Sequence, residues 1–454
     1  MGPGVRSARV DKFFAESATI SRYLEVEAAL AACQAQLGII PERAARSIAA
    51  FARAEKIDRA EYRQDFEAAG FPIVGLVRQL AKIVPEGDGE FAHWGATTQD
   101  IMDTGLVLAL RDILVWVEES LDGVIANLVP LAEQHRRTVM IGRSQMQHAV
   151  PITFGYKVAG WLSPLLRHRC RLAEVRARLL QVQFGGAVGT LASLGAQGFE
   201  VRRLFAERLR LGEPTVSWHT HRDVLCELIT FFGLLTGSLS KIATDIVLLA
   251  QTEVGEVHEP AKPGRGTSST MPQKRNPILS QQIIVSARLV RLQATGMLEA
   301  MVQDHERGSG TWQAEWTLVP DAASHTTAAL ERMVELTQAL EVHPDRMREN
   351  LERTNHLVFA EAVMMALAPH VGRQHAHDLV DAAVAETRQG SSFVDALRGS
   401  NEISDVLAPS DLQRIFDGGA HVDAADHALA KVLDAVRSPN QNGKMRPSHH
   451  GGPT

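Results

Sequence analysis

The amino-acid sequence predicts an all-α protein with a central bundle of long helices and a smaller helical domain at each end. Apolar residues recur at steps of three and four over long stretches, which is the spacing of one face of a helix. Segments in which apolar and polar residues alternate, as in half-buried strands, are almost absent. Aromatic residues make up only 5% of the chain, which also disfavours a β-rich fold.

The clearest helical pattern is a heptad seam that begins at Leu225. Its apolar positions are Leu225, Leu228, Phe232, Leu235, Leu239, Ile242, Ile246 and Leu249. The seam predicts one helix of about 30 residues, roughly 45 Å long. The same stretch carries Glu227, Lys241 and Asp245, so a bilayer span would bury three charges, and we expect no transmembrane helix.

Three further segments have the same long periodicity: Leu106 to Leu131, Val158 to Leu179, and Ile278 to about Val302. Several long helices with apolar stripes are typical of a bundle. One chain has limited apolar surface with which to cover such helices, so we expect them to associate with other copies of the chain.

The chain is expected to divide into four parts. These are a helical N-terminal domain over residues 1–104, the bundle over 105–341 with a lid loop at about 262–277, a helical C-terminal domain over 342–437, and a disordered tail over 438–454. Shorter helical patterns, such as Ile20 to Leu37 and Phe71 to Ile83, mark the N-terminal domain. The tail is rich in Pro, Asn, Gly and His and has almost no apolar residue.

Composition excludes several classes of function. The net charge is −6 and the pI is near 6.3, so nucleic acid is not expected as a partner. Cys33, Cys170 and Cys226 are far apart and form no CxxC pair, which predicts neither a disulfide framework nor a zinc site. No signal peptide precedes the first helix, and a reducing cytoplasm is the expected location.

Three polar segments interrupt the helical pattern. The first, residues 264–277, combines glycines, hydroxyls and cations (GRGTSSTMPQKRNP). Its simplest interpretation is a flexible connector between two helices. The alternative is a lid that closes on an anion, because mobile hydroxyls beside Lys274 and Arg275 suit that task.

The second polar segment, residues 93–104, precedes a long helix. Asp103 or Thr104 is suited to capping that helix. Capping leaves Thr97, Thr98 and Gln99 unexplained, and a run of neutral donors is suited to holding a carboxylate.

The third polar segment, residues 142–151, also comes before a helix. It contains His148 among other polar residues. A lone histidine is usually structural, so the residues alone leave a catalytic role open.

The ten residues from Ser268 to Pro277, SSTMPQKRNP, resemble the signature of the fumarase/aspartase superfamily. The other two polar segments match the first and second conserved blocks of that superfamily in the same order, and the similarity covers about residues 12–437. Within the superfamily, GATTQD at 95–100, the glycine-rich stretch 183–195, Trp218-His219-Thr220, and DHER at 304–307 are most similar to bacterial 3-carboxy-cis,cis-muconate cycloisomerases.

The resemblance implies a homotetramer with a core of about twenty helices, in which the three blocks of each active site come from three different subunits. It implies no cofactor and no metal. It also implies a reaction that moves a proton on the carbon next to a carboxylate of a small di- or tricarboxylate, through an aci-carboxylate intermediate that the site must stabilise.

The same resemblance assigns roles to individual residues. Ser268 is the expected base, His148 acts on the leaving group, and His93 binds the substrate or assists. The side chains expected to bind substrate are Thr97, Thr98, Gln99, Ser144, Gln145, Lys274 and Asn276. Gln145 matches neither the lyases nor the cycloisomerases of the superfamily, and Gln313 replaces a usual histidine.

These departures leave alternatives for the reaction. The first is cycloisomerisation of a carboxymuconate to a lactone. The second is a fumarate-releasing C–N lyase or epimerase acting on a substituted succinate, such as an N-substituted aspartate (iminodisuccinate, argininosuccinate or adenylosuccinate type) or nitrosuccinate. Adenylosuccinate itself is less favoured, because a nucleotide phosphate site is not evident. A catalytically inactive helical scaffold is the remaining alternative, and the presence of Ser268, Lys274 and Asn276 argues against it.

Overall fold

The computed structural model describes residues 4–438. Helices dominate these residues, and the strands form two small two-stranded antiparallel sheets. The predicted all-α class is therefore confirmed. The predicted disordered tail lies, apart from Ser438, outside the described residues.

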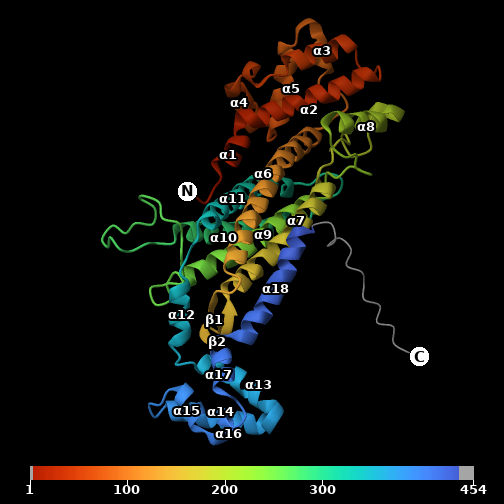
Figure 1. The fold of residues 1–454 in the computed structure, drawn as a ribbon. Coiled ribbons are helices and arrows are strands. Elements are labelled where there is room, and N and C mark those ends of the chain that lie inside the picture. Colours follow the sequence, from red (N-terminus) through yellow and green to blue (C-terminus); the bar gives the residue numbers. More distant parts are fainter. Residues whose placement is uncertain (1–3, 439–454) are drawn as a thin grey trace, which may run out of the picture. The chain divides into compact units, whose positions relative to one another are not determined.

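Four of the five long helices in the described residues occur where the apolar periodicity predicts them (Figure 1). Their bounds are α6 (Thr98–Gln134), α7 (Phe154–Leu179), α9 (Asp223–Leu249), α10 (Ile278–Ala300) and α11 (Thr311–Gln338). The heptad seam of α9 is buried throughout, since each of its apolar residues is at most 4% exposed. Helix α11 has no counterpart among the predicted long helices.

Helix α9 is long and apolar enough to cross a membrane by length and composition alone. A core helix of a soluble protein meets the same criterion, and the seam of α9 is buried in protein. Its charged residues are satisfied locally, because Lys241 pairs with Asp245, which also accepts a 2.7 Å hydrogen bond from the indole Nε1 of Trp161. That α9 does not span a membrane stays a prediction.

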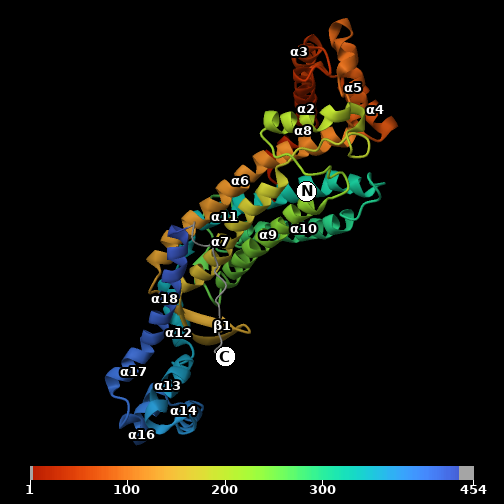
Figure 2. The ribbon, with the colours of Figure 1, turned by 90° about the vertical axis from the view of Figure 1, so that its right-hand side faces the viewer.

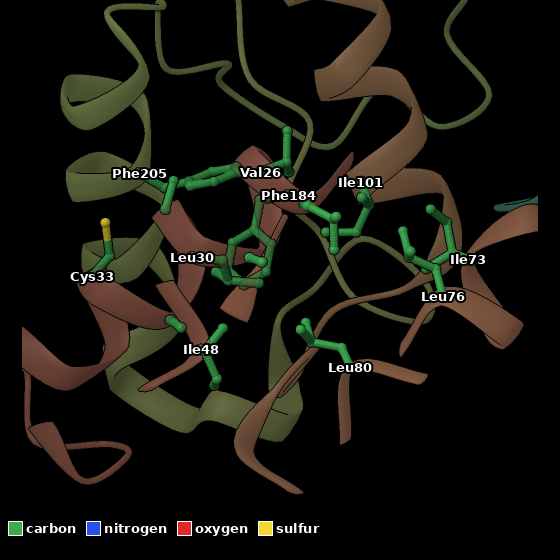
Figure 3. Close-up of a cluster of buried hydrophobic side chains, with 14 of the residues drawn as sticks. Val26, Leu30, Cys33, Ile48, Ile73, Leu76, Leu80, Ile101, Phe184 and Phe205 are labelled. Carbon is green, nitrogen blue, oxygen red and sulfur yellow. The ribbon is translucent and has the colours of Figure 1, made fainter. Parts of the chain in front are cut away.

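The N-terminal helices gather with α8 (Gly198–Leu209) in Figure 2. They are α2 (Glu16–Gln36), α3 (Glu42–Phe51), α4 (Arg59–Ala69) and α5 (Pro72–Ile83), and the short helix α1 (Ala8–Phe13) precedes them in the chain. Local sequence sets several ends: the Asp58 carboxylate caps α4, Gly70 ends it with φ +74°, and Pro72 starts α5. Figure 3 shows the apolar core that these helices share, in which Phe205 of α8 lies near Val26 and Phe184.

The C-terminal part is also helical. It contains α12 (Pro344–Glu352), α13 (Ala360–Val371), α14 (Arg373–Thr387), α15 (Phe393–Gly399), α16 (Asn401–Ser404), α17 (Pro409–Phe416) and α18 (Gly419–Arg437). Helices α13 to α17 enclose an apolar core of their own around Leu367, Phe393 and Leu397.

The described residues form two short antiparallel strand pairs, of which only the first is a hairpin. Strands β1 (Val139–Ser144) and β2 (Gln147–Thr153) pair antiparallel, and β3 (Val257–His258) pairs with β4 (Glu341–Val342). Strand β1 packs against α12 and β2 against α18 (Figure 1). The sequence pattern did not predict these strands, because they are too short for alternation to stand out.

The chain divides into two compact units. Unit 1 comprises Met1–Ser120, Arg171–Leu239 and Gln282–Arg332, and unit 2 comprises Leu121–Cys170, Ser240–Gln281 and Met333–Thr454. Each unit draws on three separate segments, because the long helices pass from one unit to the other. The predicted domains are continuous stretches of chain with boundaries at 104 and 341, whereas each compact unit combines separate stretches. Those boundaries stay predictions.

Candidate active site

In unit 1 the polar segment 93–104 leads into the N-terminus of α6. The backbone N–H of Thr97 donates to the Asp100 carboxylate at 3.0 Å, which caps the start of the helix. The Thr97 hydroxyl oxygen accepts a 2.6 Å hydrogen bond from the guanidinium of Arg307, and Thr98 is half-buried beside it in the chain. A helix N-terminus with an adjacent cation is suited to binding a carboxylate.

Asp100 holds this helix end against a glycine-rich loop. Its buried carboxylate accepts hydrogen bonds from the backbone N–H groups of Gly185 and Gly186, both at 2.9 Å. It also lies 2.7 Å from Nε2 of His219. The stretch 183–195 thus serves as a backbone support for the site, and it follows helix α7 rather than a strand.

Gln99, one of the residues expected to bind substrate, has a buried side chain. It is only 1% exposed, and its amide donates to the backbone carbonyl of His219 at 2.8 Å. Helical periodicity turns this side chain into the protein, while Thr97 and Thr98 stay at the helix end. Substrate binding by Gln99 stays a prediction.

His93 forms a dyad with Glu27 of α2. Its Nδ1 lies 2.6 Å from a carboxylate oxygen of Glu27, and its backbone N–H donates to the other oxygen at 3.1 Å. Burial lowers the pKa of His93, but the buried Glu27 carboxylate outweighs it, so the pKa of His93 is raised. His93 also has a left-handed backbone, with φ +59°, a strained conformation of the kind that clusters at functional sites.

Arg307 is a candidate site residue that sequence reasoning missed. Within residues 4–438, no carboxylate lies within ion-pair distance of its guanidinium. Burial lowers the pKa of Arg307, and the carboxylates of Asp100 and Asp103 oppose that shift. A half-buried cation without its own anion is suited to an anionic ligand. The only signal in the sequence was its place in the DHER segment of the resemblance.

In unit 2 the polar segment 142–151 contains the tip of the β1–β2 hairpin. Gln145 and Met146 form a two-residue turn with φ values of +49° and +64°. Such a turn usually takes Asn or Gly, so the conformation is strained here. Ser144, Gln145 and His148 are exposed at the tip, where a ligand has access to them.

His148 lies opposite Arg143 across the hairpin. Burial and the Arg143 cation lower the pKa of His148, with Glu256 acting in the opposite direction. The imidazole is therefore neutral near pH 7 and able to accept a proton. Arg143 is itself anchored, because its guanidinium binds the fully buried carboxylate of Glu256 through two hydrogen bonds of 2.9 and 2.7 Å.

The polar segment 264–277 is a loop that presents Ser268. The Ser268 hydroxyl oxygen accepts hydrogen bonds from the backbone N–H groups of Thr270 at 3.3 Å and Met271 at 3.1 Å. Two N–H donors on one serine oxygen stabilise negative charge there. Lys274 is exposed on the same loop, and within the described chain its ammonium has no carboxylate in ion-pair distance.

Asn276 closes the base of this loop. Its backbone N–H and its side-chain amide both donate to the carbonyl of Gly266, at 2.8 and 3.0 Å. Gly266 has φ +66°, and a Cβ there would lie 2.4 Å from the carbonyl oxygen of Asn276. The closure therefore requires glycine at position 266.

The loop is fixed at both ends. Arg275 binds the carboxylate of Glu341 through two hydrogen bonds of 2.9 and 2.8 Å and donates to the carbonyl of Glu259 at 2.8 Å. The Glu259 carboxylate caps α10 by accepting from the backbone N–H groups of Leu279 and Ser280. The loop and the hairpin are thus rooted on one segment, since Glu256 and Glu259 are three residues apart.

The described residues contain one group with metal-ligating atoms in reach of one another. It consists of His258, Glu341 and His343, whose ligand atoms all lie within 4.8 Å of one another. In the structure these groups are used otherwise: Nδ1 of His258 lies 2.9 Å from Nε2 of His343, and Glu341 binds Arg275.

The predicted site residues thus fall into two groups. Unit 1 holds His93, Thr97, Thr98 and Gln99, and unit 2 holds Ser144, Gln145, His148, Ser268, Lys274 and Asn276. Within unit 2, the hairpin and the serine loop share their anchoring segment.

Comparisons with known proteins agree with this geometry. A family model described as "Lyase" matches residues 6–292, and one described as "Adenylosuccinate lyase C-terminus" matches residues 356–432. The chain is 44% identical to trans-aconitate decarboxylase 1 of Mycosarcoma maydis, over 92% of this chain and 85% of that protein. It is 42% identical to 3-carboxy-cis,cis-muconate cycloisomerase of Pseudomonas aeruginosa, over 92% of each chain.

A solved structure gives the same picture. The 3-carboxy-cis,cis-muconate lactonizing enzyme of Pseudomonas putida superposes with a TM-score of 0.90 at 38% identity, covering 96% of this chain and 98% of that one. The chain therefore belongs to the fumarase/aspartase superfamily of lyases, and it is a lyase or an intramolecular lyase.

Proposed function

We propose that this enzyme cyclises a 3-carboxymuconate to a lactone, without a cofactor, by proton transfer at a carbon next to a carboxylate. Two separate observations support the proposal: in unit 1 a cation lies at a helix N-terminus (Arg307 on Thr97), and in unit 2 a serine oxygen accepts hydrogen bonds from two amides (Ser268). Relatives that are named as carboxymuconate cycloisomerases support this substrate class.

The proposed mechanism divides the work between the two groups. In lactone formation, a substrate carboxylate oxygen adds to the double bond, and the hydroxyl of Ser268 gives its proton to the carbon next to another carboxylate. In the reverse, elimination direction the Ser268 alkoxide takes that proton from carbon as the C–O bond breaks. The N–H groups of Thr270 and Met271, with Lys274, stabilise the alkoxide. Charge then develops on the substrate carboxylate as the aci-carboxylate forms. Arg307, Thr97, Thr98 and the N-terminus of α6 hold that carboxylate.

The two groups of site residues are proposed to meet in a homotetramer, with blocks from different subunits at each site. Large apolar side chains on α9 and α10 support association, because Leu234, Val285, Leu292 and Leu298 are between 43% and 69% exposed. Sedimentation of wild type and Leu292→Glu tests this point. We expect Leu292→Glu to dissociate and lose activity, whereas Met365→Glu, a change at another exposed apolar side chain, on α13, keeps both assembly and activity. A fully active wild-type monomer would refute the shared site.

The reaction itself is tested with purified protein. We expect loss of carboxymuconate absorbance and no appearance of fumarate from substituted succinates. Ser268→Ala should abolish turnover with assembly intact, and Ser269→Ala, one residue along the same loop, should keep it. Full activity in Ser268→Ala would refute the assignment of the base.

A second candidate is a fumarate-releasing C–N lyase or epimerase on a substituted succinate. One observation favours it: Gln313, in the first turn of α11, has a buried amide oxygen without a hydrogen-bond donor among the described residues. An amine N–H of a substrate would satisfy that acceptor. Fumarate release from an N-substituted aspartate, with carboxymuconate unchanged, would establish this candidate instead.

The cellular location is proposed to be the cytoplasm. Cys33, Cys170 and Cys226 are all unpaired, and a reducing compartment keeps them so.

A further inference from the structure

Unit 1 contains a cavity whose wall is unusually rich in aromatic side chains. Its volume is about 410 Å³, within the range of pockets that bind small molecules. Residues of α2, α4, α5, α6 and α11 line it. The aromatic ones are Phe14, Tyr23, Tyr62, Phe66, Trp312 and Trp316.

Aromatic rings of the wall contact one another, the two tryptophans edge to face and Phe66 tilted against Trp316. Trp312 and Trp316 lie 5.2 Å apart at 87°, and Phe66 lies 6.2 Å from Trp316 at 53°. This arrangement leaves ring faces and edges that a further ring can contact with the same geometry. The cavity is thus matched in shape and chemistry to a planar aromatic group.

The carboxylates in the wall already have their own cations. Glu16 binds Arg63 through two hydrogen bonds of 2.8 and 2.9 Å. Asp103 and Glu315 are both held by the fully buried Arg222, at distances from 2.5 to 3.0 Å. The charge of Glu16 is balanced by Arg63, whereas Asp103 and Glu315 share the single cation of Arg222, so that cluster keeps one negative charge when both carboxylates are ionised.

Arg22 is the exception in the wall. Its guanidinium donates to the carbonyl of Phe13 at 2.9 Å and to the hydroxyl of Thr19 at 3.3 Å, which uses two of its five N–H donors. Across residues 4–438, no carboxylate lies within 4 Å of it. Burial lowers the pKa of Arg22, opposed by Tyr23, Asp112 and Glu25. The guanidinium is half-buried and lies 4.8 Å from the centroid of the Phe13 ring, so its contacts are with neutral groups and not with a paired carboxylate.

We propose that this cavity binds a small aromatic carboxylate, with its ring among the tryptophans and its carboxylate on Arg22. An aromatic ring fits the wall by edge-to-face contact, and a carboxylate supplies the anion that Arg22 lacks. A neutral aromatic molecule would leave the buried cation unpaired, and an aliphatic acid would leave the rings without a partner. The site is distinct in its residues from Thr97 and Arg307, and the proposal does not depend on the proposed reaction.

The test uses 2-naphthoate and its neutral analogue 2-naphthamide as probes. Binding to the full chain is followed by quenching of tryptophan fluorescence and by calorimetry. We expect saturable binding of the acid, at least about tenfold tighter than the amide. Arg22→Met should abolish this preference, and Arg22→Lys, which keeps the charge, should retain it. Arg46→Met, on the exposed face of α3, should bind like wild type.

Several results would overturn the proposal. One is the absence of saturable naphthoate binding. Another is an unchanged affinity for naphthoate in Arg22→Met that thermal unfolding shows to be folded. A third is binding that survives Arg22→Met but is lost in Arg307→Met, because the acid would then occupy the Thr97 site. Ser268→Ala, which should lack turnover, should bind naphthoate as well as wild type, so failure of the proposed reaction and failure of this site remain distinguishable.

Discussion

The buried ion cluster around Arg222 offers the sharpest test of how unit 1 is held together. Arg222 is 1% exposed and binds the carboxylates of Asp103 and Glu315, which are 2% and 1% exposed. Arg222→Met removes the cation and leaves two buried carboxylates facing one another. Loss of one partner from a buried ion pair costs about 3–5 kcal/mol, so we expect the free energy of unfolding to fall by about that amount.

The pH dependence of this loss has a definite sign. Burial raises the pKa of Glu315, and Arg222 pulls it back. In Arg222→Met that pKa rises further above its unfolded value, so the native state binds protons that the unfolded chain does not. Stability of the variant then improves as the pH falls, and its deficit is largest near neutral pH and shrinks towards about pH 5.

The assay is urea unfolding followed by circular dichroism, at one protein concentration because the assembly state affects the midpoint. Arg203→Met is the matched control, since Arg203 also binds two carboxylates, Glu200 and Glu207, but on an exposed helix face. We expect no resolved change for Arg203→Met. If Arg222→Met is as stable as this control, or if its deficit grows on acidification, the reasoning about the buried cluster is wrong.

Three further predictions concern the site. Glu27→Gln should lower the pKa of His93, because the carboxylate that raises it is removed; NMR titration of the imidazole measures this, and an unchanged pKa would contradict the dyad. In the wild type, the stability that protonated His93 contributes is complete below about pH 6.5 and is lost as the pH rises through its raised pKa. Gly266→Ala should reduce kcat about 100-fold, because a Cβ would push the base of the Ser268 loop apart. Gly264 has a similar left-handed φ, but a Cβ there meets nothing within 4 Å, so Gly264→Ala is the control. Equal kcat values in the two variants would refute the steric argument. Gln99→Leu should lower the free energy of unfolding by about 1–3 kcal/mol with KM little changed, because the His219 carbonyl loses its donor. Thermal unfolding measures the stability and steady-state kinetics measure KM. A large rise in KM with unchanged stability would instead support Gln99 as a substrate ligand.

The helices of this protein were predictable because their signal is local. The seam of α9 repeats at the spacing of the helix itself, and the structure buries every residue of it. Helix α11 escaped prediction although it is as long as α9. The strands β1 and β2 escaped as well, because a short strand is stabilised by a partner elsewhere in the chain rather than by its own pattern.

The candidate site was predictable in part for the same reason. Ser268, Lys274 and Asn276 lie within one short segment, so the sequence of that segment is enough to predict roles for them. Arg307 was missed because its contact with Thr97 spans 210 positions. No local pattern marks a cation as unpaired, since pairing depends on which carboxylates the fold brings near.

Sequence alone determined that the chain is helical and that the protein resembles one superfamily of lyases, and it predicted that three polar segments carry the chemistry. These properties depend on residue type and on spacing over a few turns of chain. Only the tertiary structure decided that the Gln99 amide donates to the His219 carbonyl, that Arg307 binds the Thr97 hydroxyl at the start of α6, and that Arg22 has no carboxylate in ion-pair distance among the described residues. Burial and pairing are properties of residues far apart in sequence, and packing decides which of them meet.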